Sequence, residues 1–303
     1  MKSAIDMQVR SLADARARLA DYFALTKPRI TLMVVLTAGA GYYLGAIGAV
    51  DIVDFAQLLI GTALSGAGAS TLNQYLEREL DTRMVRTRDR PLPAGRLAPR
   101  EALVLGLILS AGGVFYLWIA TNALTALLSA ATVASYVLGY TPLKRVSTLN
   151  TIVGAVPGAL PPLGGWAAAR GDIGIGGVVL FGILFLWQLP HFLAIAWLYR
   201  HEYAKAGMRM LPCVDPTGRL TGRQVIVWTL ALVPASLMPA AVGLTGAAYF
   251  FGALVLGVAF AGFALSFARS RTNDAARRVL LYSVIYLPCL LALMVIDKGG
   301  VAF

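Results

Sequence analysis

Long uninterrupted runs of apolar residues limit what this chain can fold into more than any other feature. Each run is about 20 residues long, which lets a helix cross the ~30 Å hydrocarbon core of a bilayer. Backbone groups inside a bilayer must be hydrogen-bonded internally, so only helices or a closed barrel span it, and continuous runs favour helices. We predict an all-α polytopic membrane protein of about nine transmembrane helices, over residues 30–50, 55–76, 101–119, 122–141, 149–169, 174–198, 225–244, 247–267 and 279–296.

The distribution of charge predicts how these helices are oriented. Only 14% of the 303 residues are charged, about half the fraction that soluble proteins carry. A net charge of +11 would suggest nucleic acid in a soluble protein. In a chain this apolar it reports membrane topology instead, and we expect no nucleic-acid partner. All 26 Lys and Arg residues except Arg170 and Lys298 fall on one face, which the positive-inside rule assigns to the cytoplasm.

Nine spans then place the N-terminus in the cytoplasm and the C-terminus on the opposite side of the membrane. We expect residues 1–25 to form a solvated or interfacial cytoplasmic tail. Residues 26–303 form the transmembrane domain, around a central cavity that opens to the cytoplasm. The N-terminal segment lacks the Arg- and Ser-rich, acid-poor composition of a transit peptide, which favours a bacterial inner membrane over a mitochondrion.

The first polar cluster follows the second apolar run. Asn73, Glu77 and Asp81 are spaced four and four, so they lie along one helical face. Oxygen ligands of this kind suit Mg²⁺ shared with substrate phosphates. The alternative is an ordinary helix end that obeys the positive-inside rule, but Asn73 inside the apolar run favours function. Arginines, the natural clamps for phosphate, follow directly: Arg83, Arg86, Arg88 and Arg90.

Two more clusters end the fourth and sixth apolar runs. Tyr140 and Lys144 are four apart, and Lys144 with Arg145 would complete a phosphate site, unless they only set the topology. Gln188 and His191 lie three apart inside the sixth run, with Glu202 at its end. Polar side chains at that depth favour a function. Prolines and glycines at residues 154–165 predict a pocket wall, or close helix packing.

These residues are consistent with two classes of function, an enzyme acting on a lipid diphosphate and a transporter. Acidic clusters with arginines above an apolar cavity suit a lipid diphosphate, whose departure Mg²⁺ would assist. A transporter of haem or anions would instead favour ionisable residues at the bilayer midplane and matching half-helices. Cys213 and Cys289 lie far apart and imply neither a disulfide framework nor a zinc site.

Three motifs resemble one family closely. They are NQYLERELDTRMVRTRDRPLP, YTPLKR with STLNTIVGAVPGALPPLGGW, and WQLPHFLAIAWLYRHEYAKAGMRMLP. Together they are similar to those of the protoheme IX farnesyltransferases, a branch of the membrane-embedded aromatic prenyltransferases. The resemblance starts at TKPRITL, residue 26, and its nine-helix plan fits the whole chain.

This resemblance implies transfer of a farnesyl group from farnesyl diphosphate to a vinyl group of haem B, with addition of water, giving haem O. It also implies service to terminal oxidase assembly, with haem A synthase or assembly factors as partners. A related enzyme acting on a quinone precursor is the alternative. The implied roles are Mg²⁺ binding by Asn73, Glu77 and Asp81, catalysis with Glu202, diphosphate binding by Arg86, Arg88, Arg90, Tyr140, Lys144 and Arg145, and haem binding by His191 and Gln188.

One departure concerns the second acidic motif of the superfamily. That motif is commonly a pair of aspartates four apart, whereas this chain has Glu202 and Ala206. A second complete metal site is therefore in doubt, unless Asp215 contributes.

Overall fold

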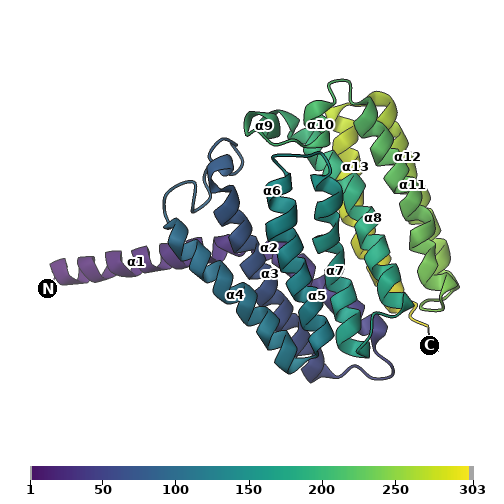
Figure 1. Cartoon of the computed structure of the whole chain (residues 1–303), viewed down its shortest axis with the longest axis horizontal. Helices are drawn as coiled ribbons and strands as arrows, with labels where there is room; N and C mark the ends of the chain where they lie inside the picture. Colours follow the sequence, from purple (N-terminus) through teal and green to yellow (C-terminus); the bar gives the residue numbers. More distant parts are fainter. Residues whose placement is uncertain (1, 300–303) are drawn as a thin grey trace.

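The computed structural model describes residues 2–299, with side chains from residue 14 onward, and these residues form a bundle of long helices (Figure 1). No β-strand occurs within residues 2–299, where Thr245 and Lys298 form one isolated bridge. The elements are α1 (Lys2–Leu25), α2 (Pro28–Gly45), α3 (Ile52–Asp81), α4 (Pro99–Ala120), α5 (Ala123–Ala134), the π-helix η1 (Ser135–Tyr140), α6 (Thr141–Leu143), α7 (Asn150–Arg170), α8 (Ile175–Leu198), α9 (Arg200–Lys205), α10 (Leu211–Val214), α11 (Arg219–Ala241), α12 (Ala247–Ser270) and α13 (Asn273–Ile296).

The predicted all-α membrane fold is confirmed. In the described part of the chain, eight helical segments are each long and apolar enough to cross a membrane, with α5, η1 and α6 counted as one. Residues 14–25 of α1 together with α2 form a ninth candidate, bent by 47° at the break. The first predicted span was drawn too long, because α2 ends at Gly45 and a turn follows. In that turn Gly48 has a positive φ and Asp51 caps α3.

The N-terminal segment, predicted to be a solvated or interfacial tail, is helical over Lys2–Leu25. In Figure 1, α1 projects sideways from the bundle. Its last turns dock on α4 and the loop before it, where Arg18 and Tyr22 both donate to Glu101 and Asp21 pairs with Arg96. Leu25 is fully buried against the same region. The expected boundary at residue 25 coincides with the corner between α1 and α2.

Helix α7 stays continuous although it contains three prolines. The backbones of α7 and α2 lie so close together that a Cβ on Gly165 would collide with the Ala38 carbonyl oxygen. The same happens on its other side, where Gly158 leaves room for the amide of Gln188 from α8. Both sequence readings therefore hold: α7 packs tightly on two helices and also lines a cavity, through Leu160 and neighbouring residues.

The two halves of the bundle are packed differently. Helices α8, α11, α12 and α13 enclose a filled core of large buried side chains, among them Tyr249, Phe260, Phe267 and Tyr286. Helices α2 to α5 with α7 instead surround a cavity. The end of the bundle that carries the loops at 82–98, 144–149 and 199–218 holds most basic residues, and we call it the basic end.

Candidate active site at the basic end

Three polar side chains share one face of α3, as their spacing predicts. Asn73, Glu77 and Asp81, here called the α3 triplet, are 1%, 5% and 1% exposed. Each binds a basic side chain from a different segment, here called the basic trio. The contacts are Lys27 Nζ to Asn73 Oδ1 at 2.6 Å, Lys144 Nζ to Glu77 Oε1 at 2.6 Å, and Arg90 Nη1 to Asp81 Oδ2 at 2.7 Å. The structure thus brings together segments 27, 73–81, 90 and 144.

Lys27 was not among the predicted site residues. It lies at the corner between α1 and α2 in the left-handed conformation, with φ 46°, which directs the chain around the corner. The corner is held by Gln74, whose side chain donates to the carbonyls of Ala24 and Leu25 at 3.2 and 2.9 Å. In the sequence, a lysine directly before Pro28 marked only the flank of a span. The contact of Lys27 with Asn73 depends on the bend between α1 and α2, which the sequence does not indicate.

Lys144 reaches the triplet from the end of a π-helix. The wider turn of η1 leads into α6, where Thr141 accepts a hydrogen bond from the Asn73 amide at 3.0 Å. The Lys144 ammonium also lies 4.4 Å from the centre of the Tyr140 ring. Burial alone would lower the pKa of Lys144, but the Glu77 carboxylate, with Tyr140 and Tyr136, raises it above its ordinary value. Lys144 is therefore a permanent cation at neutral pH.

Arg90 is brought to the triplet by the loop after α3. The buried Thr87 hydroxyl donates to the Asp81 carbonyl at 3.0 Å, so the chain turns back over the helix end. Arg86 instead reaches outward to α9, donating to Tyr203 Oη at 2.8 Å and stacking over Tyr199. Among the predicted diphosphate ligands, Arg90, Lys144 and Tyr140 thus lie at the triplet. The others, Arg86, Arg88 and Arg145, are exposed.

The loop after α8 packs over the end of α3. Leu80 and Met84 form a buried cluster with Met208 and Met210 of that loop. Glu202 lies on α9 in the same loop, and its Oε2 is buried without a hydrogen bond from any described residue. Asp215, the other acid considered for this motif, caps the start of α11 instead, since its carboxylate accepts hydrogen bonds from Thr217 and Thr221.

The oxygens of the triplet fit a hard cation. Within the described residues no group of three His, Cys, Asp or Glu side chains is arranged to hold a metal. The triplet, however, supplies two carboxylates and an amide oxygen, and Asp81 Oδ1 is buried without a hydrogen bond from any described residue. Mg²⁺ is commonly held by one or two carboxylates, with the remaining positions taken by water and substrate phosphate. The donor set is of this kind.

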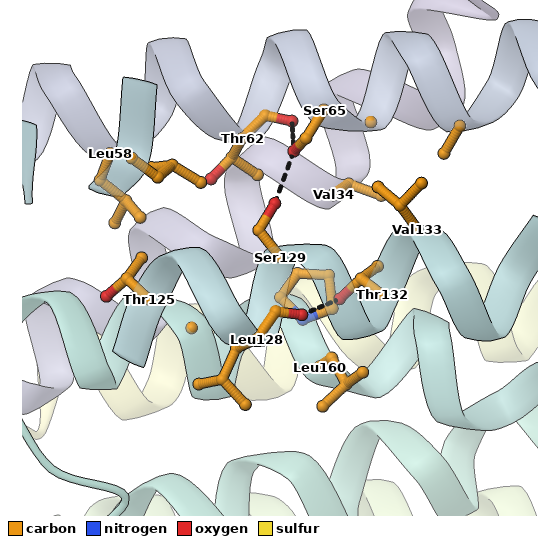
Figure 2. A pocket seen from close by; sticks show the side chains of 15 residues that line it. Val34, Leu58, Thr62, Ser65, Thr125, Leu128, Ser129, Thr132, Val133 and Leu160 are labelled. Atoms are coloured by element: carbon orange, nitrogen blue, oxygen red, sulfur yellow. Dashed lines mark hydrogen bonds between the residues drawn. The ribbon is translucent and has the colours of Figure 1, made fainter. Parts of the chain in front are cut away.

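An apolar cavity lies below the triplet on the same face of α3. Leu58, Thr62, Ser65 and Ala69 line it, and their spacing of three or four residues keeps them on the face that carries Asn73. Figure 2 shows Ser129 of α5 reaching across to Ser65, with the two hydroxyl oxygens 2.9 Å apart. The cavity encloses about 40 Å³. At 1.5 Å per residue, its lining covers roughly 16 Å of α3 from Ala69 down to Leu58.

The two predicted haem residues contact different neighbours. Gln188 donates to the Ala155 carbonyl of α7 at 3.2 Å, whereas His191 Nδ1 lies 2.7 Å from Ser283 Oγ of α13. The Ser283 hydroxyl proton is given to the Leu280 carbonyl at 2.6 Å. Nδ1 of His191 is therefore the donor in this pair, and Nε2 keeps its lone pair. No described residue hydrogen-bonds to Nε2.

The chain matches the model of the UbiA prenyltransferase family over residues 34–286. Among curated proteins it is 46% identical over 289 residues to "Protoheme IX farnesyltransferase" of Solibacter usitatus, covering 92% of this chain and 99% of that one. It is 45% identical over 277 residues to the protein of the same name from Salinibacter ruber, covering 91% of this chain and 98% of that one.

Solved structures show the same fold at low sequence identity. A structure described as digeranylgeranylglyceryl phosphate synthase in membranes matches with a TM-score of 0.78 at 16% identity, over 93% of this chain and 98% of that one. A UbiA homolog from Archaeoglobus fulgidus bound to GPP and Mg²⁺ matches with a TM-score of 0.60 at 16% identity, over 90% and 99%. The chain therefore belongs to the UbiA prenyltransferase family, within the branch of the protoheme IX farnesyltransferases.

Proposed function

We propose that the protein transfers a farnesyl group from farnesyl diphosphate to a vinyl group of haem B, with addition of water, to make haem O. The observation that carries this proposal is the arrangement along α3, where a charged cluster stands directly above an apolar cavity. A prenyl diphosphate has the same polarity, with a charged head on a hydrocarbon tail. The names of the curated relatives support farnesyl and haem as the substrates.

The basic trio would bind the diphosphate head. Each member already faces an oxygen of the α3 triplet, so a substrate oxygen arriving there meets three donors from three segments. Arginine binds phosphate oxygens in a bidentate manner, while lysine acts as a point charge. The exposed Arg86, Arg88 and Arg145 lie at the surface of the same end, where they would attract the anion during its approach.

The α3 triplet would hold Mg²⁺. Glu202, in the loop after α8 that packs over the end of α3, would assist it. When bound, the ion would neutralise charge that builds up on the departing diphosphate. The UbiA homolog from Archaeoglobus fulgidus was solved with GPP and Mg²⁺, which supports this assignment for the family. Among the described residues, Asp81 and Glu202 are the carboxylates with an oxygen that is buried without a hydrogen bond, so each would gain from a nearby cation.

The cavity marks the path along which the farnesyl chain would lie between the helices, with its first carbon away from water. At about 40 Å³ the cavity is smaller than the chain, so the surrounding helices must move apart to admit it. The bond from that carbon to the diphosphate oxygen breaks, and the electron pair leaves with diphosphate. The farnesyl carbon then bonds to the vinyl group of haem. Water adds to the resulting carbocation and loses a proton, which completes the hydroxyethylfarnesyl group. The lining shown in Figure 2 would shield the chain from water. The hydroxyls of Ser65 and Ser129 do not disturb this apolar surface, because they bond to each other.

His191 of α8 would bind haem. Its Nε2 carries the free lone pair that an axial ligand needs, while Ser283 fixes the ring through Nδ1. We expect His191→Ala to weaken haem binding at least about tenfold in an absorption titration and to leave farnesyl diphosphate binding within about twofold. His201→Ala, the exposed second histidine, is the matched control. An unchanged titration would remove His191 from the site.

One incubation separates this function from its alternatives. Purified protein is mixed with haem B, farnesyl diphosphate and Mg²⁺, and the products are analysed by mass. Haem O with release of diphosphate supports the proposal. Product only with a quinone precursor would assign the protein to that class of prenyltransferase. Movement of haem or anions across vesicles without use of diphosphate would assign it to transport.

We place the protein in the bacterial inner membrane with its basic end in the cytoplasm. The basic loops support this orientation through the positive-inside rule. The N-terminus then lies in the cytoplasm and the C-terminus on the opposite side, and haem A synthase or oxidase assembly factors are candidate partners for haem O. A membrane-impermeant thiol reagent applied to intact cells tests the orientation, because Cys213 would be shielded and a cysteine placed at Asp172 would react.

A further inference from the structure

A second basic site lies at the other side of the bundle, between the ends of α11 and α12. It is a groove of about 370 Å³, within the range of roughly 300–1,000 Å³ typical of ligand pockets. In Figure 1 these two helices form the edge of the bundle opposite to α1. The groove is lined by Arg219, Arg223, Ile226, Val227, Ala268 and Arg271.

The lining residues of α11 form a gradient of polarity along one helical face. Arg219 and Arg223 are four apart at the start of the helix, and Ile226 and Val227 follow one turn further on. Guanidinium groups therefore stand at the basic end, and branched apolar side chains lie below them. Val227 and Leu230 on this helix are exposed, so the lower part of the groove faces the surrounding lipid.

The α12 side completes the groove. The two helices approach closely at its base, where a Cβ on Gly222 would lie 3.0 Å from Ala268 Cα. Arg271 follows the last residue of α12 in the left-handed conformation, with φ 51°, where the chain turns from α12 into α13. Its Cδ lies 3.5 Å from the Cβ position of Gly218, directly before α11. Three guanidinium groups from two helices thus border one space.

The described residues supply no counter-ion to these three arginines. Among the ion pairs of the described residues, none involves Arg219, Arg223 or Arg271. Asp215, the acid closest in sequence, is engaged by Thr217 and Thr221. Three unpaired guanidinium groups around one groove repel one another, and an external anion relieves that repulsion.

We propose that this groove binds the phosphate of an anionic phospholipid, with an acyl chain lying along Ile226 and Val227. Guanidinium forks match phosphate oxygens, and basic pockets between transmembrane helices on the cytoplasmic side are suited to lipid headgroups. The apolar lower half distinguishes a lipid from a soluble phosphate, which would leave Ile226 and Val227 without a partner. The site is separate from the α3 triplet and does not depend on the proposed reaction.

The test measures lipid binding to the full-length protein in detergent. Native mass spectrometry counts the phosphatidylglycerol or phosphatidylcholine molecules retained as each lipid is titrated. We expect the wild type to retain phosphatidylglycerol at an at least about tenfold lower concentration than phosphatidylcholine, because arginines attract a headgroup that carries a net negative charge. The variant R219Q/R223Q/R271Q is expected to lose this preference. A matched control, R269Q/R277Q/R278Q, removes three arginines from the same end outside the groove and is expected to keep it.

A second measurement separates the lipid from its free headgroup. Phosphatidylglycerol is expected to raise the melting temperature of the wild type and of the control variant, but not of the groove variant. Glycerol phosphate at equal ionic strength is expected to have no effect. Equal loss of lipid preference in both triple variants would overturn the proposal, because general surface charge would then suffice. Equal stabilisation by glycerol phosphate would also overturn it, since the ligand would then be a soluble phosphate.

Discussion

The buried carboxylates of Glu77 and Asp81 are balanced by cations of the protein itself, Lys144 and Arg90. Removing a carboxylate therefore has two consequences, loss of a proposed metal ligand and exposure of a buried ammonium or guanidinium without a partner. For Glu77→Ala the second effect alone costs about 3–5 kcal/mol, the usual penalty for breaking a buried ion pair. Substitution by the matching amide keeps the shape and a hydrogen-bond acceptor, so it isolates the role of charge.

We expect Glu77→Gln and Asp81→Asn each to lower haem O formation at least about 100-fold, because a metal site that loses a carboxylate loses much of its affinity. Product is quantified by mass after incubation with haem B, farnesyl diphosphate and Mg²⁺. Glu79→Gln is the control, since Glu79 lies on the same helix but is exposed and pairs only with Arg78. Near-normal product from purified Asp81→Asn protein would contradict the metal role.

Lys27 offers a sharper test of diphosphate binding. Lys27→Met retains the apolar stem and removes the ammonium that contacts Asn73. We expect the KM for farnesyl diphosphate to rise at least about tenfold, with a smaller change in the KM for haem B, as loss of one charged hydrogen bond predicts. Arg29→Met, two residues further and exposed, is the control. Equal effects of the two changes on KM would show that only the overall charge matters.

The sequence was sufficient for the α3 triplet and insufficient for its partners. Four-residue spacing within one helix predicts a shared face without knowledge of any other segment, so Asn73, Glu77 and Asp81 were found. Lys27 needed the left-handed turn at the α1–α2 corner. Likewise, which of the alternating arginines turns inward depends on the path of the loop after α3. The loop selects Arg90 and directs Arg86 towards Tyr203.

At the scale of elements, departures from regular α-helix coincide with the site. The π-helix η1 widens the turn before Thr141 and Lys144, and π-helical turns are frequent at functional sites. Pro142 favours a break in the helix before Lys144, but the sequence does not indicate the direction in which Lys144 then points. Helix α7, by contrast, remains regular despite its prolines, because neighbouring helices compensate for missing hydrogen bonds in a membrane.

The start of α11 depends on one carboxylate. Burial raises the pKa of Asp215, but hydrogen bonds from Thr221, Thr217 and Gly218 outweigh it and leave the pKa below its ordinary value. A carboxyl whose pKa is lower in the folded state stabilises that state above its unfolded pKa of about 3.9, and the contribution is lost as pH falls through the folded value. We expect Asp215→Asn to lower the melting temperature at pH 7.

The difference in melting temperature between wild type and Asp215→Asn is expected to shrink as the pH falls below about 4. Thermal unfolding in detergent, followed by circular dichroism between pH 3 and 7, measures it. Asp274→Asn is a suitable control, since that exposed acid lies in the first turn of α13. A difference that stays constant over this range would contradict the assigned titration.

At the scale of the whole molecule, the cavity has a defined far end. Leu58 is the residue of α3 lining the cavity that lies furthest from the triplet, Leu117 of α4 lines the cavity as well, and both are buried. Their position predicts that they limit the length of the prenyl chain. Because the lining descends only about 16 Å along α3, one further isoprene unit would meet these side chains.

We expect Leu117→Ala to raise the ratio of kcat/KM for geranylgeranyl over farnesyl diphosphate about tenfold, because truncation extends the cavity. Competition between the two diphosphates, with products resolved by mass, measures the ratio directly. Leu107→Ala removes an exposed leucine from the same helix and is expected to leave the ratio unchanged. If Leu117→Ala and Leu107→Ala gave the same ratio of kcat/KM for the two diphosphates, the end of the prenyl chain would lie away from Leu117. Some loss of stability, about 2–5 kcal/mol, accompanies truncation of a buried leucine.

Near the end of the described chain, the Lys298 ammonium donates to the carbonyls of Tyr43 and Ala46 at 2.6 and 2.8 Å. This contact joins the last helix to the end of α2. Because α2 is synthesised long before α13, it is already in the membrane when α13 leaves the ribosome. The bundle, and with it the side-chain position of His191 that Ser283 orients, is completed only after α13 has been made. Chains that stop before α13 are thus expected to be inserted and inactive.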